Sequence, residues 1–141
     1  MPPDAERDRL ALEWLRHAQS NLDLARQPKS ARVLWDHLAF EAQQAAEKAI
    51  KALLIYRGIE FPHAHDLSQL LMLLDEPGGA LPGDLWEAAA VLTPYAVLAR
   101  YPGLDPPTSE EACRRAVALA ERVVRWAEEV LGVHGSELGP R

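Results

Sequence analysis

Three polar side chains recur at a helical spacing near the middle of the chain. Gln44, Lys48 and Lys51 stand at positions i, i+4 and i+7, which places them along one edge of a helix. The sequence has three lysines against twelve arginines, and two of the three lie on this edge. Such a row can bind a ligand through its ammonium and amide donors. It can also be a solvated face, on which Glu47 and Lys51 form an ordinary ion pair worth about 0.3 kcal/mol.

The helix that positions this row is predicted over residues 31–57. Ser30 is placed to cap its start, and Gly58 to end it. On a helical wheel the arc opposite the polar row holds leucines and many alanines, which let neighbouring helices approach closely. The polar row is therefore expected to face away from the packed side of this helix.

Capping residues and breakers divide the rest of the chain into four more helical segments. The first runs over residues 4–26, and a short one follows Pro62 with Asp66 as its N-cap. Another is predicted over residues 84–100, with Pro94 expected to bend or to restart it, and the last ends near residue 131. Thr108 and Glu111 have the spacing of a capping box at the start of the last segment.

No segment alternates apolar and polar residues with the period of a strand. The fold class is therefore predicted to be all-α, an antiparallel four- to five-helix up-and-down bundle. Residues 1–132 are expected to form this bundle as one domain, and residues 133–141 a flexible C-terminal tail.

Composition excludes several classes of protein. The net charge of −6 argues against sequence-blind nucleic-acid binding through a broad basic surface. No apolar run approaches the roughly 20 residues that span a bilayer, and the N-terminus lacks the pattern of a signal peptide. Cys113 is the sole cysteine, which excludes an internal disulfide. We expect a cytoplasmic protein with no membrane contact and no cofactor, in which Cys113 is a packing residue.

Histidines and arginines supply weaker candidates. Arg57 and His63 are separated by five residues, but they span a helix end with Gly58 and Pro62 between them, so the match is interpreted as coincidental. His63 and His65 stand two apart with no third ligand nearby, and no metal site is predicted.

Two further groups of residues carry open alternatives. His65 can contact a ligand or fix its loop by a hydrogen bond. Arg100 and Tyr101 can end a helix and pack, or they can bind a phosphate and stack on a base.

Several segments together resemble a known family. Residues 40–54, which contain the Gln-Gln-Ala-Ala-Glu-Lys-Ala-Ile-Lys-Ala string, are similar to the signature helix of HEPN domains (higher eukaryotes and prokaryotes nucleotide-binding). The resemblance extends to residues 14–25, Gly58, residues 65–67 and residues 99–102. It covers about residues 8 to 132 and implies a helical bundle that is usually dimeric.

The same resemblance implies two kinds of activity. Some HEPN proteins are metal-independent ribonucleases, often toxins, with an arginine followed after four to six residues by a histidine near the last long helix. A histidine can move the proton of the 2′-hydroxyl, and an arginine can stabilise the charge on phosphorus. Other members are non-catalytic partners of small nucleotidyltransferases or bind nucleotides or RNA. Beyond Arg100 the only histidine is His134, in the tail, so this chain lacks a catalytic pair at the family's position.

The leading hypothesis is therefore a non-catalytic, homodimeric binding module. Its partner is expected to be a nucleotide, RNA or a small nucleotidyltransferase protein, in an arrangement like one half of a two-gene toxin–antitoxin system. The predicted ligand-binding residues are Gln44, Lys48, Lys51, His65, Arg100 and Tyr101. The alternatives are a ribonuclease toxin that uses Arg57 and His63, or His65 with Arg100, and a purely structural dimeric interaction protein.

Overall fold

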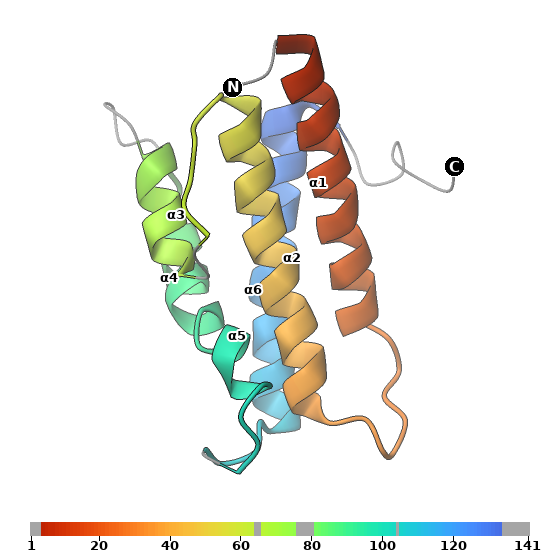
Figure 1. The fold of residues 1–141 in the computed structure, drawn as a ribbon. Coiled ribbons are helices and arrows are strands. Elements are labelled where there is room, and N and C mark those ends of the chain that lie inside the picture. Colours follow the sequence, from red (N-terminus) through yellow and green to blue (C-terminus); the bar gives the residue numbers. More distant parts are fainter. Residues whose placement is uncertain (1–3, 64–65, 76–80, 104, 134–141) are drawn as a thin grey trace.

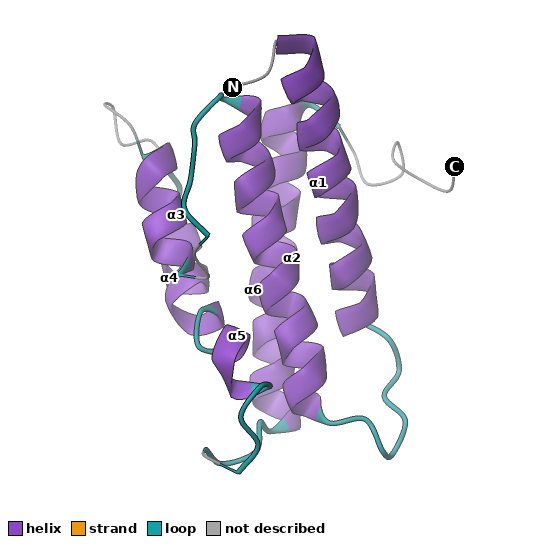
Figure 2. Cartoon of the chain, in the orientation of Figure 1, coloured by secondary structure: helices purple, strands orange, loops and turns teal. Residues whose placement is uncertain are grey.

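The computed structural model describes residues 4–63, 66–75, 81–103 and 105–133 of the 141-residue chain. These residues form six helices and no strand (Figures 1 and 2). The helices are α1 (Asp4–Ala25), α2 (Trp35–Tyr56), α3 (Leu67–Leu74), α4 (Gly83–Leu92), α5 (Tyr95–Leu98) and α6 (Glu110–Leu131). The predicted all-α class is confirmed.

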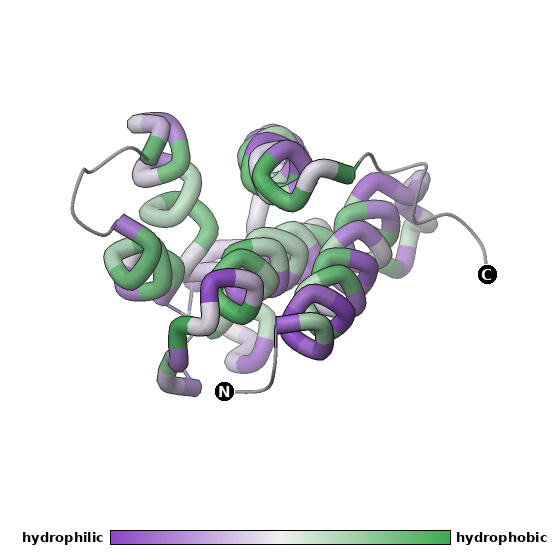
Figure 3. The backbone as a smooth tube through the Cα atoms, turned by 90° about the horizontal axis from the view of Figure 1, so that it is seen from above, coloured by the Kyte–Doolittle hydropathy of each residue, from purple (hydrophilic) through white to green (hydrophobic). Residues whose placement is uncertain are grey.

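The long helices form an up-and-down bundle with α2 at its centre. In Figure 1, α1 and α2 run antiparallel on neighbouring positions, and α6 lies behind them. The α4–α5 segment runs antiparallel to α6, and α3 is the extra short helix beside it. Seen along the bundle in Figure 3, α2 has α1 on one side, α3 and α4 on the opposite side and α6 behind it. The central helix is therefore covered on most sides.

Small side chains on α2 make this close packing feasible. Six of its alanines are almost completely buried: Ala39, Ala42, Ala45, Ala46, Ala49 and Ala52. Larger residues such as Leu15 of α1 and Leu85 of α4 fill the remaining core. Alanine also favours the helical conformation, so one residue type serves both local structure and packing.

The start of α2 differs from the prediction. The helix begins at Trp35, and its N-cap residue Leu34 makes no capping hydrogen bond through its side chain. The predicted cap, Ser30, lies earlier, where its carbonyl accepts a hydrogen bond from the N–H of Val33 at 3.2 Å. Residues 31–33 therefore form a turn, and the prediction of Ser30 as the cap is wrong.

The start of α6 is shifted by one residue from the predicted capping box. Ser109 is the N-cap, and its hydroxyl accepts a hydrogen bond from the N–H of Ala112 at 3.0 Å. The N–H of Thr108 instead donates to Oδ1 of Asp36 in α2, at 2.7 Å. The spacing in the sequence could not show which of the two adjacent hydroxyl residues, Thr108 or Ser109, caps the helix. The choice depends on the contact of Thr108 with a distant helix.

Other predicted boundaries are confirmed. Gly58 follows α2 with φ +72°, and the N–H of Ile59 donates back to the carbonyl of Leu54 at 2.9 Å, as in a glycine-terminated helix. Asp66 caps α3 by accepting from the N–H of Ser68 at 3.0 Å. Pro94 divides α4 from α5, because it cannot continue the hydrogen-bond ladder.

None of the helices in the described part of the chain is long and apolar enough to cross a membrane. The described chain ends at Val133, whose N–H donates to the carbonyl of Glu128 at 3.0 Å. The tail predicted over residues 133–141 lies outside the described residues from residue 134 onward.

Candidate functional site

A row of polar side chains interrupts the apolar surface of α2. Three of them are buried within the bundle: Gln43 is 0% exposed, Glu47 4% and Lys51 6%. They follow one another at intervals of four residues, so they lie on one stripe of the helix. Buried charges destabilise a fold unless they are paired, so the partners of this row decide what it can do.

Hydrogen bonds connect the row from end to end. Nε2 of Gln44 donates to Oε1 of Gln43 at 2.7 Å, and Nε2 of Gln43 donates to Oε1 of Glu47 at 3.0 Å. Nζ of Lys51 donates to Oε2 of Glu47 at 2.9 Å. Both carboxylate oxygens of Glu47 therefore accept a hydrogen bond. The orientation of the Gln44 amide is coupled through the row to the buried ion pair.

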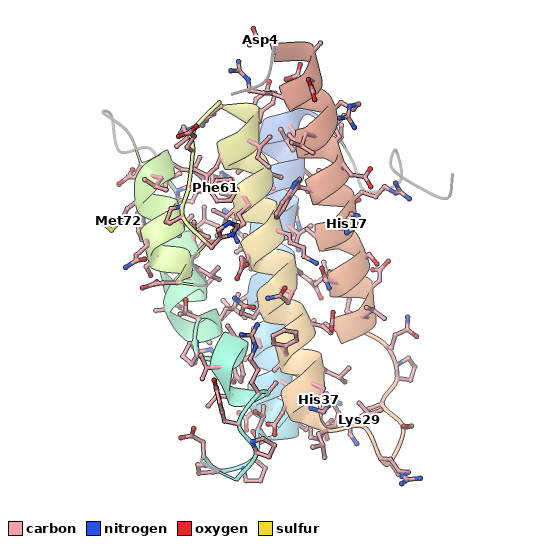
Figure 4. The ribbon with its side chains drawn as sticks, viewed as in Figure 1. Asp4, His17, Lys29, His37, Phe61 and Met72 are labelled. Atoms are coloured by element: carbon pink, nitrogen blue, oxygen red, sulfur yellow. The ribbon has the colours of Figure 1, made fainter. Side chains whose placement is uncertain are left out.

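An aromatic cover lies over Lys51. Phe61 belongs to the connector between α2 and α3, and its ring centroid is 5.5 Å from Nζ of Lys51. Its ring also meets Trp14 of α1 edge to face, with centroids 6.4 Å apart and an interplanar angle of 82°. Figure 4 shows Phe61 between α2 and α3. A cation against an aromatic face is attracted to it, so the connector both covers and stabilises the ammonium group.

Lys48 lies in a different environment, between α1 and α2. Its Nζ donates to Oδ1 of Asn21 at 2.8 Å, and Nδ2 of Asn21 donates to Oε1 of Glu41 at 2.7 Å. Lys48, Asn21 and Glu41 are all half-buried. One of three ammonium donors of Lys48 is used by this contact, so the group is held in place with donors remaining for a ligand.

The helical wheel did not predict that Lys48 and Lys51 lie in different environments. It placed Gln44, Lys48 and Lys51 on one outward-facing edge, whereas Gln44 and Lys48 are half-buried and Lys51 is buried. A wheel gives the angle of each residue but not what covers it, and here the connector with Phe61 returns over the helix. The interpretation of the row as a solvated face with an exposed ion pair is therefore wrong.

Arg100 and Tyr101 lie toward the other end of the bundle. Both are exposed and follow α5, at the end where α2 begins (Figure 1). Lys51 lies sixteen residues after Trp35, about 24 Å along the helix at about 1.5 Å per residue. Gln44, Lys48 and Lys51 are thus grouped on α2, and Arg100 and Tyr101 form a separate exposed surface. Their binding roles stay predictions.

Within the described residues, no hydrogen bond or ion pair joins Arg57 to His63. Nη1 of Arg57 donates to the carbonyl of Leu74 at 3.3 Å and so links the end of α2 to the end of α3. His63 is exposed in the connector, and His65 lies outside the described residues. Within the ranges that the structure describes, no three His, Cys, Asp or Glu side chains gather as metal ligands do.

Asn21, Glu41 and Gln43 belong to the polar network but were not predicted as site residues. Gln43 is a polar residue within the alanine-rich stretch of α2, and this could have marked it as a candidate. Asn21 and Glu41 carried no such signal, because their meeting depends on how α1 packs against α2. Cross-helix partners of this kind require the tertiary structure.

A second group of titratable side chains lies where α2, α5 and α6 meet. Burial raises the pKa of the Cys113 thiol above its ordinary value of 9.0, and the negative charges of Asp36 and Glu110 raise it further. Burial also raises the pKa of Tyr95 above 10.0, with the Cys113 thiolate adding to the shift and Arg115 opposing it. Cys113 is 2% exposed. It is therefore a neutral core residue at pH 7, as its predicted packing role requires.

Comparison with known proteins identifies the class of this bundle. The HEPN domain family matches residues 11–130. A solved archaeal HEPN homologue superposes with a TM-score of 0.69 at 28% identity, over 86% of this chain and 97% of that one. A HEPN domain protein from Thermotoga maritima, at 23% identity, has the same fold, with a TM-score of 0.56 over 90% of this chain and 98% of its own. No curated protein matches the chain. The chain belongs to the HEPN domain family.

Proposed function

We propose that this HEPN protein is a non-catalytic binding module whose ligand is a nucleotide or RNA. The observation that carries the proposal is the half-buried Lys48, fixed by its hydrogen bond to Asn21 at 2.8 Å and one helical turn from Gln44. An ammonium group held in place loses less conformational entropy on binding a phosphate than a mobile one. The surface around Lys48, where α1 meets α2, is the proposed phosphate site.

Lys51 has a positioning role in this proposal. Its ammonium donates to Glu47, and Glu47 accepts from Gln43, which in turn accepts from Gln44. Through these hydrogen bonds, the buried ion pair fixes the orientation of the Gln44 amide, which faces the ligand. Arg100 and Tyr101 are proposed to contact a second part of a long ligand such as RNA, because they lie toward the other end of α2.

The binding function is favoured over ribonuclease activity by the contacts of Arg57. Its guanidinium is engaged with the carbonyl of Leu74, and His63 lies exposed in the connector. A phosphoryl-transfer site needs its acid–base group and its cation directed at one phosphate. We further propose that the protein works in the cytoplasm as a homodimer beside a small nucleotidyltransferase, as one half of a two-gene system.

The test of binding is fluorescence anisotropy with a labelled single-stranded RNA, followed by competition with ATP. Lys48→Glu is expected to weaken binding about tenfold, a loss of about 1.4 kcal/mol, because it replaces an attraction for phosphate by a repulsion. Arg125→Glu is the matched control, since it makes the same charge change at an exposed position of α6. Equal losses in the two variants would show that only net charge matters and would overturn the proposed site at Lys48.

Two further measurements separate the alternatives. RNA incubated with the protein in the absence of divalent metal should stay intact. Cleavage that disappears in a His63→Ala, His65→Ala double variant would establish the ribonuclease instead. Sedimentation equilibrium should give a dimer mass, and co-expression with a nucleotidyltransferase encoded nearby should yield a complex of fixed stoichiometry. A complex that forms while the protein binds neither RNA nor ATP would favour the purely structural role.

A further inference from the structure

A hollow opens at the opposite end of the bundle from Lys51. It has a volume of about 470 Å³ and lies between the end of α1, the loop before α2, and the first turns of α2 and α6. Small-molecule sites are typically about 300–1,000 Å³ in volume, so the hollow is of a suitable size for a metabolite. It includes neither Gln44 nor Lys48 and is independent of the proposed nucleotide site.

The walls of this hollow are apolar. Ala25, Leu38, Val117 and Cys113 line it, and Trp35 contributes an aromatic ring. Cys113 carries no charge at neutral pH, because burial raises the pKa of its thiol. Apolar walls with an indole favour the ring of an aromatic ligand, which gains both burial and ring contacts.

Cations gather around the rim, although the chain as a whole is acidic. Arg26, Lys29 and Arg114 line the hollow together with one carboxylate, Glu121. Nη1 of Arg26 lies 3.8 Å from Oε1 of Glu121, which offsets that negative charge. Arg26 is also paired with Asp23 at 3.1 Å, and Arg114 is paired with Glu110 at the start of α6. Both arginines that line the hollow are thus paired with carboxylates, so Lys29 supplies the charge that favours an anion.

Lys29 is the cation with the most defined position. Its Nζ donates to the carbonyl of Ser30 at 3.0 Å and to the carbonyl of Val33 at 2.8 Å. The same atom lies 5.0 Å from the ring centroid of Trp35, and Figure 4 shows Lys29 in the loop beside the start of α2. An ammonium has three donors, so these two carbonyls leave one for a ligand next to the indole.

We infer that this hollow binds a small aromatic anion, such as an aromatic carboxylate or an aryl phosphate. The ring of the ligand packs against Trp35 and Val117, and its anionic group accepts a hydrogen bond from Lys29. The inference rests on residues of the loop and of α6, so it can hold or fail independently of RNA binding at Lys48.

The experiment is a fluorescence titration with 1-anilinonaphthalene-8-sulfonate as the probe, followed by competition with phenyl phosphate, benzoate and benzyl alcohol. We expect both anions to displace the probe at concentrations at least tenfold lower than the uncharged alcohol. Lys29→Gln should weaken phenyl phosphate binding about tenfold, because it removes the charge and shortens the side chain by one atom. Arg125→Gln, on an exposed part of α6, should leave binding unchanged.

A steric variant tests the position of the ligand. Ala118 is an exposed residue that lines the hollow, so Ala118→Phe should abolish probe binding. Ala90→Phe, at an exposed position of α4, is its control. Equal displacement by benzyl alcohol and phenyl phosphate would overturn the inference, and so would full probe binding in Ala118→Phe. Unchanged phenyl phosphate binding in Lys29→Gln would overturn it even if Ala118→Phe fails to fold.

Discussion

α2 and α6 have the same length, 22 residues each, but they occupy different positions in the bundle. α2 buries thirteen of its residues, including Gln43, Glu47 and Lys51, whereas α6 buries seven, none of them charged. Exposed arginines of α6 form surface ion pairs, such as that of Arg115 with Glu87 at 3.3 Å. A polar residue therefore has a different energetic meaning on each helix. On α2 the stability of the fold depends on whether a polar side chain has a partner, whereas on α6 water can replace that partner.

The largest effect is expected for the buried ion pair. Glu47→Ala leaves the ammonium of Lys51 buried without its carboxylate, and should lower the free energy of unfolding by about 3–5 kcal/mol in urea denaturation. Glu129→Ala, at an exposed position of α6, should change it by less than about 0.5 kcal/mol. Replacing the pair together, with Glu47→Leu and Lys51→Met, should cost less than Glu47→Ala alone. Similar losses in the free energy of unfolding for Glu47→Ala and Glu129→Ala would mean that water reaches the polar row on α2.

Adding volume to the two helices sharpens the same contrast. Ala49 is 0% exposed between packed helices, so Ala49→Leu should destabilise the protein by about 1–3 kcal/mol through overpacking. Ala118→Leu makes the identical change on the exposed side of α6 and should stay within about 0.5 kcal/mol. Thermal unfolding measured by circular dichroism compares them. Equal melting temperatures would contradict the close packing of α2.

The starts of the two helices differ in how they are capped. Ser109 caps α6, so Ser109→Ala should cost about 1 kcal/mol in urea denaturation. Ser30→Ala should cost less than about 0.5 kcal/mol, because only the carbonyl of Ser30 is used in the turn before α2. A larger loss for Ser30→Ala than for Ser109→Ala would reassign the cap of α2 to Ser30.

The smallest expected effect is an alkaline loss of stability at the junction of α2 and α6. Folding raises the pKa of Cys113 above 9.0, so below about pH 9 the thiol is protonated in both states and stability is unaffected. As the pH rises above about 9, the unfolded chain loses this proton before the folded protein does, so the free energy of unfolding falls. The fall ends once the pH has passed the pKa of the folded state. Urea midpoints measured between about pH 8 and pH 10.5 should show this decline, and Cys113→Ser should reduce it. A decline unchanged in Cys113→Ser would assign it to Tyr95, whose pKa is also raised.

Local sequence signals predicted the fold well at positions where a single residue determines the backbone conformation. Gly58 adopts positive φ, Asp66 caps α3, and Pro94 interrupts a helix, all as expected from their chemistry. The errors at Ser30 and Thr108 occur where distant contacts decide between neighbouring residues. Thr108, for example, is positioned by Asp36, which is 72 residues away in the sequence.

The candidate site was less predictable than the fold. The helical period correctly grouped Gln44, Lys48 and Lys51 on one side of α2. It could not predict that Phe61 covers Lys51 or that Asn21 holds Lys48, because both contacts come from other elements. Burial depends on how the helices assemble, so the residue pattern along one helix cannot predict it.

The separation in sequence of these contacts also bears on the order of folding. Lys48 meets Asn21 across 27 residues, whereas Asp36 meets Thr108 across 72. Closing the longer loop costs about 0.9 kcal/mol more in chain entropy, and contacts between nearby segments form faster. We therefore expect α1 and α2 to pair before α6 docks. The whole polar row and its aromatic cover lie between Trp14 and Phe61, so a ribosome completes them well before the helix that closes the bundle.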